Sequence, residues 1–411
     1  MDQNKLREYA RLVVRVGVNV QPGQPVIVNC PVERADFGRL LLHESYEAGA
    51  SNVYMLWGDD YCSREHWLRA EEAAFDAVEP WNALQLNSLA EKGAARIAVH
   101  ASDPENLKGV DADRLQRYNK AVGRDLEPFY RLMMANGIPW CVVSVPIPSW
   151  AKTVFPALSE AEAMEKLWEE IFASVRISGD GSAVKRWEEH CRDLEEKCAG
   201  LNALKLRRLH YTNALGTDLT VEMPENHVWM GGGDVCRSGV RFVANMPTEE
   251  IFSAPRRDGV NGTLVASKPL VLNGNLIEGI RFELRDGRIV GIHADRNEEL
   301  LRKAVDTDEG SHYLGEIALV PYHSPISDSG ILFYNTLFDE NASCHFAFGE
   351  AYPACIQGGD ELETEELIRR GINAKSDMHE DFMVGTADLS ITGETEDGRI
   401  VTIFRDGDFA L

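Results

Sequence analysis

A histidine and an aspartate stand two residues apart in the segment NAKSDMHEDFMVGTADLSITG, residues 373–393. In a strand, residues two apart project from one face, so His379 and Asp381 would share a face while Glu380 points to the other. Their apolar neighbours indicate burial, and buried charged side chains are rare without a partner. Alone, the pattern favours a hydrogen-bonded pair that fixes a strand over a pair that ligates a metal ion, because short motifs often match by chance.

Two further segments of the second half hold ionisable side chains among apolar residues. Glu316 stands alone in YLGEIALVP, where an unpaired carboxylate would be costly or forced neutral. The segment NTLFDENASCHFAFGEAY, residues 335–352, carries Asp339, Glu340 and His345. A solvated turn is the alternative there, because DENAS is rich in turn-forming and capping residues.

Glu249 and Glu250 lie between two prolines in NMPTEEIFSAP, where a solvated loop is an adequate alternative. Four segments therefore supply the carboxylate and imidazole groups that a dinuclear metal site needs. Oxygen and nitrogen donors without thiolate suit zinc, cobalt or manganese, and many carboxylates favour a catalytic site with room for water. Two divalent ions would bring four positive charges, and the carboxylates of Glu250, Glu316, Glu340 and Asp381 would bring four negative ones. His345 and His379 would add neutral donors.

Taken together, the four segments resemble the aminopeptidase T family of dinuclear metallo-aminopeptidases, also called the thermophilic aminopeptidase family. The family's characteristic strings look like PTxEIFTAP, LGEIALVP, LFDENAxxHxAxGxAY and HxDFMxG. This chain has PTEEIFSAP, LGEIALVP, LFDENASCHFAFGEAY and HEDFMVG in the same order. The chain length and the segment SWAKTVFP, residues 149–156, are similar as well, so the resemblance covers the whole chain. Each string alone is moderately specific, and all four in order are strongly specific.

The resemblance implies a cytoplasmic exopeptidase of broad specificity that forms homodimers and hydrolyses peptides with a free N-terminus. It implies two divalent ions bridged by Glu316, with a metal-bound hydroxide attacking the peptide carbonyl. Tyr352 matches the family's active-site tyrosine and would hydrogen-bond the tetrahedral intermediate. Glu250 and Glu316 are the candidates for the proton shuttle. The implied metal ligands are Glu250, Glu316, Glu340, His345, His379 and Asp381.

Two other functions would use similar ligands. A different dinuclear hydrolase could act on a phosphoester or a non-peptide amide. Phosphate would call for Arg or Lys clamps, and the four motifs hold none, although Arg256 and Arg257 lie close by. The other class is a non-catalytic peptide-binding protein with a structural metal, which would have no need of Tyr352 or of an open coordination position.

Three features look reactive but predict no site. HESYE, residues 43–47, lacks the second histidine of an HExxH zinc motif and is interpreted as a solvated helix face. MGGGD, residues 230–234, does not match the dinucleotide pattern GxGxxG, so we expect it to shape a turn or to let a backbone approach closely. Cys344 would point away from His345 in an extended segment, which gives it little weight as a nucleophile.

The composition is that of a soluble globular protein, with 44% hydrophobic and 26% charged residues in a chain of 411. The net charge of -24 disfavours nucleic acid and anionic lipid as partners, because both are negatively charged. The N-terminal segment shows no signal-peptide pattern, and no apolar run reaches the length of a membrane span. Eight cysteines without paired CxxC spacing are typical of reduced thiols in a cytoplasmic protein.

The candidate site residues must be positioned by the second half of the chain, where alternating patterns and Asp-Gly turns predict antiparallel sheet. The clearest examples are KLRRLHYT, IRFELRDGRIVGIHA and GRIVTIFRDGDF. We therefore expect residues 201–411 to form a mainly antiparallel α+β domain that holds the metal site.

The first half alternates helical and strand patterns. Helical spacing precedes each of four apolar runs that predict buried strands: Val26–Cys30, Asn52–Trp57, Ala95–Ala101 and Trp140–Val145. A strongly helical stretch follows at 160–203. We expect residues 1–200 to form a parallel α/β domain.

Overall fold

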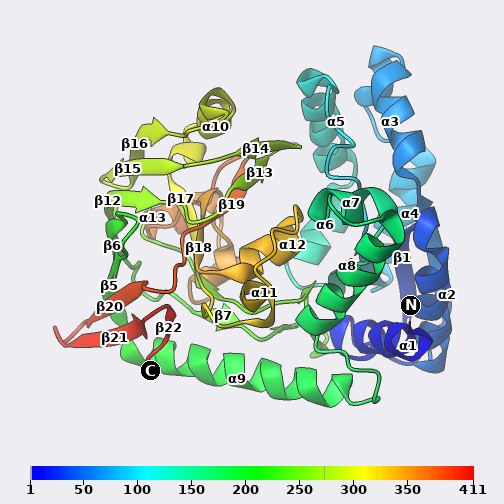
Figure 1. Ribbon diagram of the computed structural model, residues 1–411, viewed down its shortest axis with the longest axis horizontal. Coiled ribbons are helices and arrows are strands. Elements are labelled where there is room, and N and C mark those ends of the chain that lie inside the picture. Colours follow the sequence, from blue (N-terminus) through cyan, green and yellow to red (C-terminus); the bar gives the residue numbers. More distant parts are fainter. Residues whose placement is uncertain (1, 273) are drawn as a thin grey trace. The chain divides into compact units, whose positions relative to one another are not determined.

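The computed structural model describes residues 2–272 and 274–411 (Figure 1). The chain forms two compact units: residues up to Glu189 together with Gly233–Pro247, and His190–Gly232 together with Thr248–Leu411. The predicted boundary between residues 200 and 201 falls inside the helix α9 (Ala183–Leu204), and it stays a prediction.

The first unit is built on a five-stranded sheet in which every pairing is parallel. Val26, Ile27 and Val28 of β1 and Ile97 of β3 are fully buried, as the apolar runs predict. The parallel α/β layer expected for the first half is therefore confirmed. In spatial order the strands are β10 (Asn245–Met246), β4 (Trp140–Ser144), β3 (Ala95–His100), β1 (Pro25–Pro31) and β2 (Asn52–Gly58).

Helices separate the strands of this sheet in the sequence. Local capping explains where several begin: Ser159 and Glu162 form a reciprocal capping box before α8, and prolines open α4 and α7. The helices are α1 (Gln3–Leu12, continued by a π-helix at Val13–Gly17), α2 (Ala35–Glu47), α3 (Asp60–Arg69), α4 (Pro80–Glu91), α5 (Ala112–Asp125), α6 (Glu127–Met134), α7 (Pro148–Val154) and α8 (Glu160–Ser174). Short elements of this unit are β8 (Asp234–Val235), β9 (Arg241–Phe242) and the 3-10 turns Val32–Arg34 and Glu72–Phe75.

The HESYE segment lies on α2 and is a solvated face only in part. His43 and Glu47 are exposed as expected. Glu44 is buried instead, and it accepts a hydrogen bond from Arg11 Nε at 3.1 Å. Ser45 is fully buried as well. The interpretation as a wholly solvated face is therefore wrong for these two residues, because an arginine of α1 offers Glu44 the partner that burial requires and Ser45 donates to the carbonyl oxygen of Leu41 at 2.7 Å.

The second unit contains an eight-stranded antiparallel sheet and a second, five-stranded one. Two hairpins turn at Asp286-Gly287 and Asp406-Gly407, where both residues of each pair have positive φ, as tight hairpin turns require. The larger sheet runs β16 (Arg288–His293), β15 (Arg281–Arg285), β12 (Val260–Val265), β6 (Asp218–Glu222), β5 (Leu206–Thr212), β20 (Ser390–Thr395), β21 (Ile400–Arg405) and β22 (Asp408–Phe409). The smaller runs β19 (His379–Met383), β18 (His345–Gly349), β17 (Leu314–Leu319), β11 (Ile251–Ser253) and β7 (Met230–Gly231).

Shorter elements complete this unit (Figure 1). They are α10 (Glu298–Val305), α11 (Pro325–Asp328), α12 (Thr336–Asp339), α13 (Thr364–Arg369), the strand pair β13 (Leu270–Leu272) and β14 (Asn275–Ile277), and 3-10 turns at Gly310–His312, Glu340–Ala342, Pro353–Cys355 and Gly359–Glu361. Within the described residues, no helix combines the length and the apolar character that crossing a membrane requires.

The smaller sheet has two chemically different faces. One face packs against the larger sheet in a shared apolar core, where Tyr211 meets Phe346 and Phe282 meets Phe382 with ring centroids 5.2 and 5.1 Å apart. Side chains alternate between the faces of a strand, so the neighbours of these core residues project to the opposite side. That opposite side carries Glu250, Glu316, His345, His379 and Asp381.

Candidate metal centre

The candidate ligands come from neighbouring strands of the smaller sheet. The register pairs Glu316 with Ala347, and Ala347 with Asp381, so the two carboxylates flank a single methyl group in one row. His345 lies two residues before Ala347 on the same face of β18. The small side chain between the carboxylates leaves room that a longer one would fill.

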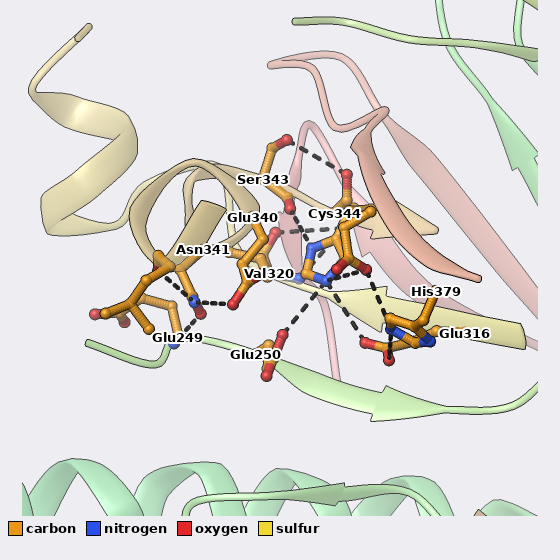
Figure 2. Close-up of polar contacts among 12 residues, drawn as sticks. Glu249, Glu250, Glu316, Val320, Glu340, Asn341, Ser343, Cys344 and His379 are labelled. Carbon is orange, nitrogen blue, oxygen red and sulfur yellow. Dashed lines mark hydrogen bonds and ion pairs between the residues drawn. The ribbon is translucent and has the colours of Figure 1, made fainter. Parts of the chain in front are cut away.

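Glu316 is the centre of the cluster. Its Oε1 lies 3.6 Å from Nε2 of His345. Its Oε2 lies 3.4 Å from Nε2 of His379 (Figure 2). His345 also lies 3.4 Å from Glu250 Oε2, while Asp381 Oδ1 lies 3.8 Å from Nε2 of His379. The two oxygens of the Glu316 carboxylate thus face different histidines.

Both imidazoles are oriented by backbone carbonyls. Nδ1 of His345 donates to the carbonyl oxygen of Ser343 at 3.2 Å, and Nδ1 of His379 donates to that of Glu350 at 2.7 Å. With Nδ1–H bonded to a backbone carbonyl, Nε2 is the ring nitrogen that faces the carboxylates. This orientation by the second nitrogen is typical of metal-binding histidines.

Glu250 and Glu340 approach from outside these three strands. Glu250 directly precedes β11, whose register places Ile251 opposite Leu319 of β17. Glu340 opens a 3-10 turn that contacts β19. The sequence alternatives of a solvated loop and a solvated turn are wrong, because Glu250 is only 13% exposed and the turn residues Asn341 and Ala342 are fully buried.

Charge within the cluster is strongly coupled. Burial alone would raise the pKa of Glu316, but its interactions with His345 and His379 lower that pKa to about 2. Burial and the negative charges of Asp381 and Glu250 raise the pKa of Glu340 well above its ordinary value. Burial would lower the pKa of His379, but Glu316 and Asp381 raise it to about 10. The cluster as it stands therefore attracts positive charge.

The donor set fits divalent metal ions. Two groups of ligand atoms each lie within 4.8 Å of one another: Glu250, Glu316 and His345, and Glu316, His379 and Asp381. In the part of the chain that the structure describes, neither Lys nor Arg forms an ion pair with these carboxylates, and the buried Oδ1 of Asp381 has no hydrogen-bond partner. A buried oxygen without a partner is costly unless a cation occupies the space beside it.

Glu340 belongs to neither group of three. It lies close enough to Asp381 and Glu250 for their charges to raise its pKa. Its Oε1 accepts a hydrogen bond from Asn341 Nδ2 at 3.4 Å. The role of Glu340 as a ligand therefore stays a prediction.

Tyr352 lies beside the cluster with 38% of its surface exposed. Its ring centroid is 5.2 Å from that of His379 and 6.0 Å from that of Phe252. Desolvation, followed by the charges of Glu316 and Asp381, raises the pKa of its hydroxyl well above the ordinary value. The hydroxyl therefore keeps its proton and can donate a hydrogen bond.

Two neighbours of the candidate ligands have structural partners. Asp339 accepts the backbone N–H groups of Phe333 and Asn335 at 2.7 and 3.0 Å, so it fixes a loop. The thiol of Cys344 hydrogen-bonds the backbone of Val320, and burial raises its pKa to about 12. The low weight given to Cys344 as a nucleophile agrees with these contacts, because a thiol must ionise to attack.

The glycines of MGGGD let backbones approach closely. A Cβ at Gly231 would lie 2.7 Å from the carbonyl oxygen of Glu250, and one at Gly232 would lie 2.5 Å from that of Cys191. Both distances are too short for a side chain. The expected close approach of a backbone is confirmed, and the approaching backbone belongs to this chain. Gly231 thereby supports the strand that leads out of Glu250.

Sequence reasoning missed the partners behind the cluster. Glu249, only 4% exposed, lies 3.7 Å from Nε2 of His190, which also hydrogen-bonds the carbonyl oxygen of Thr248 at 2.8 Å. Asn341 donates to Glu340 and accepts from Glu249. The sequence offered one indication of the role of Asn341, which is that it directly follows the predicted ligand Glu340.

A pocket of about 1130 Å³ elsewhere in the second unit is lined by none of the six candidate ligands. Its basic residues are largely balanced by acidic neighbours, since Arg256 pairs with Asp258 at 2.7 Å and Arg370 pairs with Glu366 at 3.1 Å.

Comparisons with known proteins cover the chain from end to end. The family described as thermophilic metalloprotease (M29) matches residues 2–409. Aminopeptidase AmpS of Bacillus subtilis (strain 168) is 47% identical over 407 residues, which are 99% of this chain and 98% of that protein. Aminopeptidase T of Thermus aquaticus is 40% identical over 406 residues, with 99% and 98% covered.

Solved structures agree. Wild-type AmpT from Thermus thermophilus superposes with a TM-score of 0.92 at 39% identity, with both chains covered completely. 2,5-Dihydroxypyridine dioxygenase from Pseudomonas putida KT2440 has a TM-score of 0.50 at 13% identity, with 99% of this chain and 96% of that chain covered, and it shares the fold alone. The mixed α/β fold and the family predicted from the four motifs are confirmed: the chain belongs to the M29 family of thermophilic metalloproteases.

Proposed function

We propose that this metalloprotease is an aminopeptidase that removes the N-terminal residue of peptides with the help of two divalent ions. The observation that carries the proposal is the pair of ligand groups that share Glu316, each with one oriented histidine. The relatives named aminopeptidases span the whole chain, which supports the same activity.

The residues divide between two positions. Glu250 and His345 would hold one ion, His379 and Asp381 the other, and Glu316 would bridge them. Glu340 would complete the set, since its nearness to other carboxylates favours a cation beside it. Zinc, cobalt and manganese all suit these oxygen and nitrogen donors.

The chain's own residues then act on the peptide. When bound, the ions supply Lewis-acid polarisation of the scissile carbonyl and lower the pKa of nearby water. The carboxylate wall attracts the positively charged amino terminus, and Tyr352 donates a hydrogen bond to the oxygen that becomes negative. Glu250 and Glu316 are the candidates for taking up and returning the proton.

Neither of the two alternatives gains support from the structure. A phosphoesterase would need free cationic clamps. Arg256 is paired with Asp258, and Arg257 stacks 3.8 Å over the ring of Tyr313 and donates to Asn373. A purely structural metal would not require Tyr352 beside the ligands. The homodimer and the cytoplasmic location implied by the resemblance stay predictions.

The decisive experiment strips the protein with a chelator and restores zinc, cobalt or manganese. Release of N-terminal residues is measured from a peptide with a free amino terminus and from its acetylated form. We expect activity only with metal and only on the free peptide. Equal cleavage of the acetylated peptide would rule out an aminopeptidase.

A further inference from the structure

We infer that Asn341 is a positioning residue that holds two metal-binding segments at a fixed separation. The inference rests on the proposed metal centre and goes beyond it, because Asn341 offers no ligand itself. It is fully buried, next to Glu340 in the 3-10 turn. Buried amides need hydrogen-bond partners, so the partners of this one are informative.

The Asn341 side chain bonds to three different places. Its Oδ1 accepts the backbone N–H of Glu249 at 2.7 Å (Figure 2). Its Nδ2 donates to the carbonyl oxygen of Leu337 at 3.0 Å and to Oε1 of Glu340 at 3.4 Å. Both N–H groups and the oxygen are therefore used.

The orientation of this amide is fixed by its surroundings. The backbone N–H of Glu249 can only donate, so Oδ1 must face it, and the backbone carbonyl of Leu337 can only accept, so Nδ2 must face that. Aspartate has the same shape but lacks both donors and would bring a negative charge against Glu340. Alanine would leave the N–H of Glu249 without its partner.

These bonds join two segments that are far apart in the sequence. The bond to Glu249 fixes the backbone immediately before Glu250, and the bond to Glu340 fixes that carboxylate. His190 supports the same backbone from the other direction through the carbonyl oxygen of Thr248. Loss of Asn341 would thus displace Glu250 relative to Glu340 while His345, His379 and Asp381 stay on their strands.

The test uses the whole protein in metal-free form, with Asn341→Asp and Asn341→Ala as variants. Asn202→Asp is the matched control. Oδ1 of Asn202 accepts the backbone N–H of Trp229, and its Nδ2 donates to the carbonyl oxygen of the same residue. Neither bond touches a candidate ligand. Cobalt(II) is titrated into each protein, and the dissociation constants and visible absorption spectra are recorded together with thermal unfolding by circular dichroism.

We expect both Asn341 variants to bind at least one cobalt ion about 10 to 100 times more weakly than the parent, with an altered spectrum, as changes in groups that orient ligands typically cause. Asn202→Asp should keep the parent's affinity and spectrum even where its unfolding temperature falls. A folded Asn341 variant with the parent's affinity and spectrum would overturn the inference. Failure of both variants to fold would also overturn it, because Asn341 would then serve the stability of the whole unit.

The titration separates this inference from the proposed activity. A parent protein that binds two cobalt ions but releases no residues would refute the aminopeptidase proposal, and the variants would still decide the role of Asn341. A parent that binds no cobalt would refute both.

Discussion

Glu8 and Glu44 of the first unit are about as buried as Glu316 of the second, with exposures of 8%, 5% and 5%. Their partners differ. Glu8 accepts the backbone N–H groups of Gly179 and Ala183 at 2.7 and 2.8 Å, and Glu44 accepts from Arg11. Glu316 has two histidines at 3.4 and 3.6 Å and further carboxylates around it.

The difference separates structural from chemical use of a buried carboxylate. The carboxylates of Glu8 and Glu44 are satisfied by hydrogen bonds within the protein, so they stabilise the fold and have no remaining capacity for a ligand. In the cluster around Glu316, the negative charges exceed what the imidazoles can balance. Such a surplus costs folding free energy unless cations from solution neutralise it.

Glu316→Gln should have the largest effect, because it removes the ligand that both ligand groups share. We expect kcat/KM to fall by more than about 100-fold, the upper end of what altering a mere partner of a ligand costs. The metal-free variant should also be less stable than the metal-free parent at neutral pH, because His345 and His379 lower the folded-state pKa of Glu316 to about 2 and its charge therefore stabilises the fold. Activity assays and thermal unfolding with and without metal measure both effects.

Glu44→Gln is the control from the first unit, and it should lose stability without losing activity. Its activity should persist, and its unfolding free energy should fall by about 1 kcal/mol, a small loss because Arg11 is 61% exposed and stays hydrated. Near-normal turnover by Glu316→Gln would contradict the bridging role.

Tyr352→Phe should have the next largest effect. Loss of a donor to the developing oxyanion typically costs about 2.7 to 4 kcal/mol, or about 100- to 1000-fold in kcat. Because Tyr352 is not a predicted ligand, cobalt affinity should stay at the parent's value. Steady-state kinetics and metal titration check the two halves of this expectation, and an unchanged kcat would remove Tyr352 from the mechanism.

Sequence periodicity was enough to predict the face on which the candidate ligands lie. Glu316 in an apolar run and His379 with Asp381 at spacing two both depend on the alternation of a strand, which is a local property. The parallel strands of the first unit followed in the same way from β-branched runs. Local patterns thus predicted the elements and the sides of the sheet.

Long-range contacts could not be predicted in this way. The two-residue strand β10 pairs with β4, more than a hundred residues earlier in the chain, and carries no periodic pattern of its own. The burial of Glu249 depends on His190 of a distant helix, and the segment alone suggested a solvated loop. The partners of Asn341 likewise come from separate segments, so only the folded chain shows them.

Asp308 contrasts with Glu316 within the second unit, because its carboxylate is satisfied by hydrogen bonds from the protein. Burial would raise its pKa, but hydrogen bonds from the backbone N–H of Asp377 and Ser311 and from the hydroxyl of Ser376 hold it below the ordinary value. Because the folded-state pKa is depressed, these bonds stabilise the fold above the unfolded pKa of about 3.9. That stability is lost as the pH falls through the folded-state value.

Asp308→Asn should therefore lower the unfolding free energy by about 1.5 to 3 kcal/mol at neutral pH, as the loss of charge-assisted hydrogen bonds does. The difference from the parent should shrink as the pH falls below the unfolded pKa of about 3.9 and through the lower folded-state pKa. Urea unfolding at pH 7 and at pH 3 measures both values. A difference that stays constant between the two would show that packing, not charge, explains the effect. Activity loss out of proportion to this instability would show that Asp308 also positions β19, which begins two residues after Asp377.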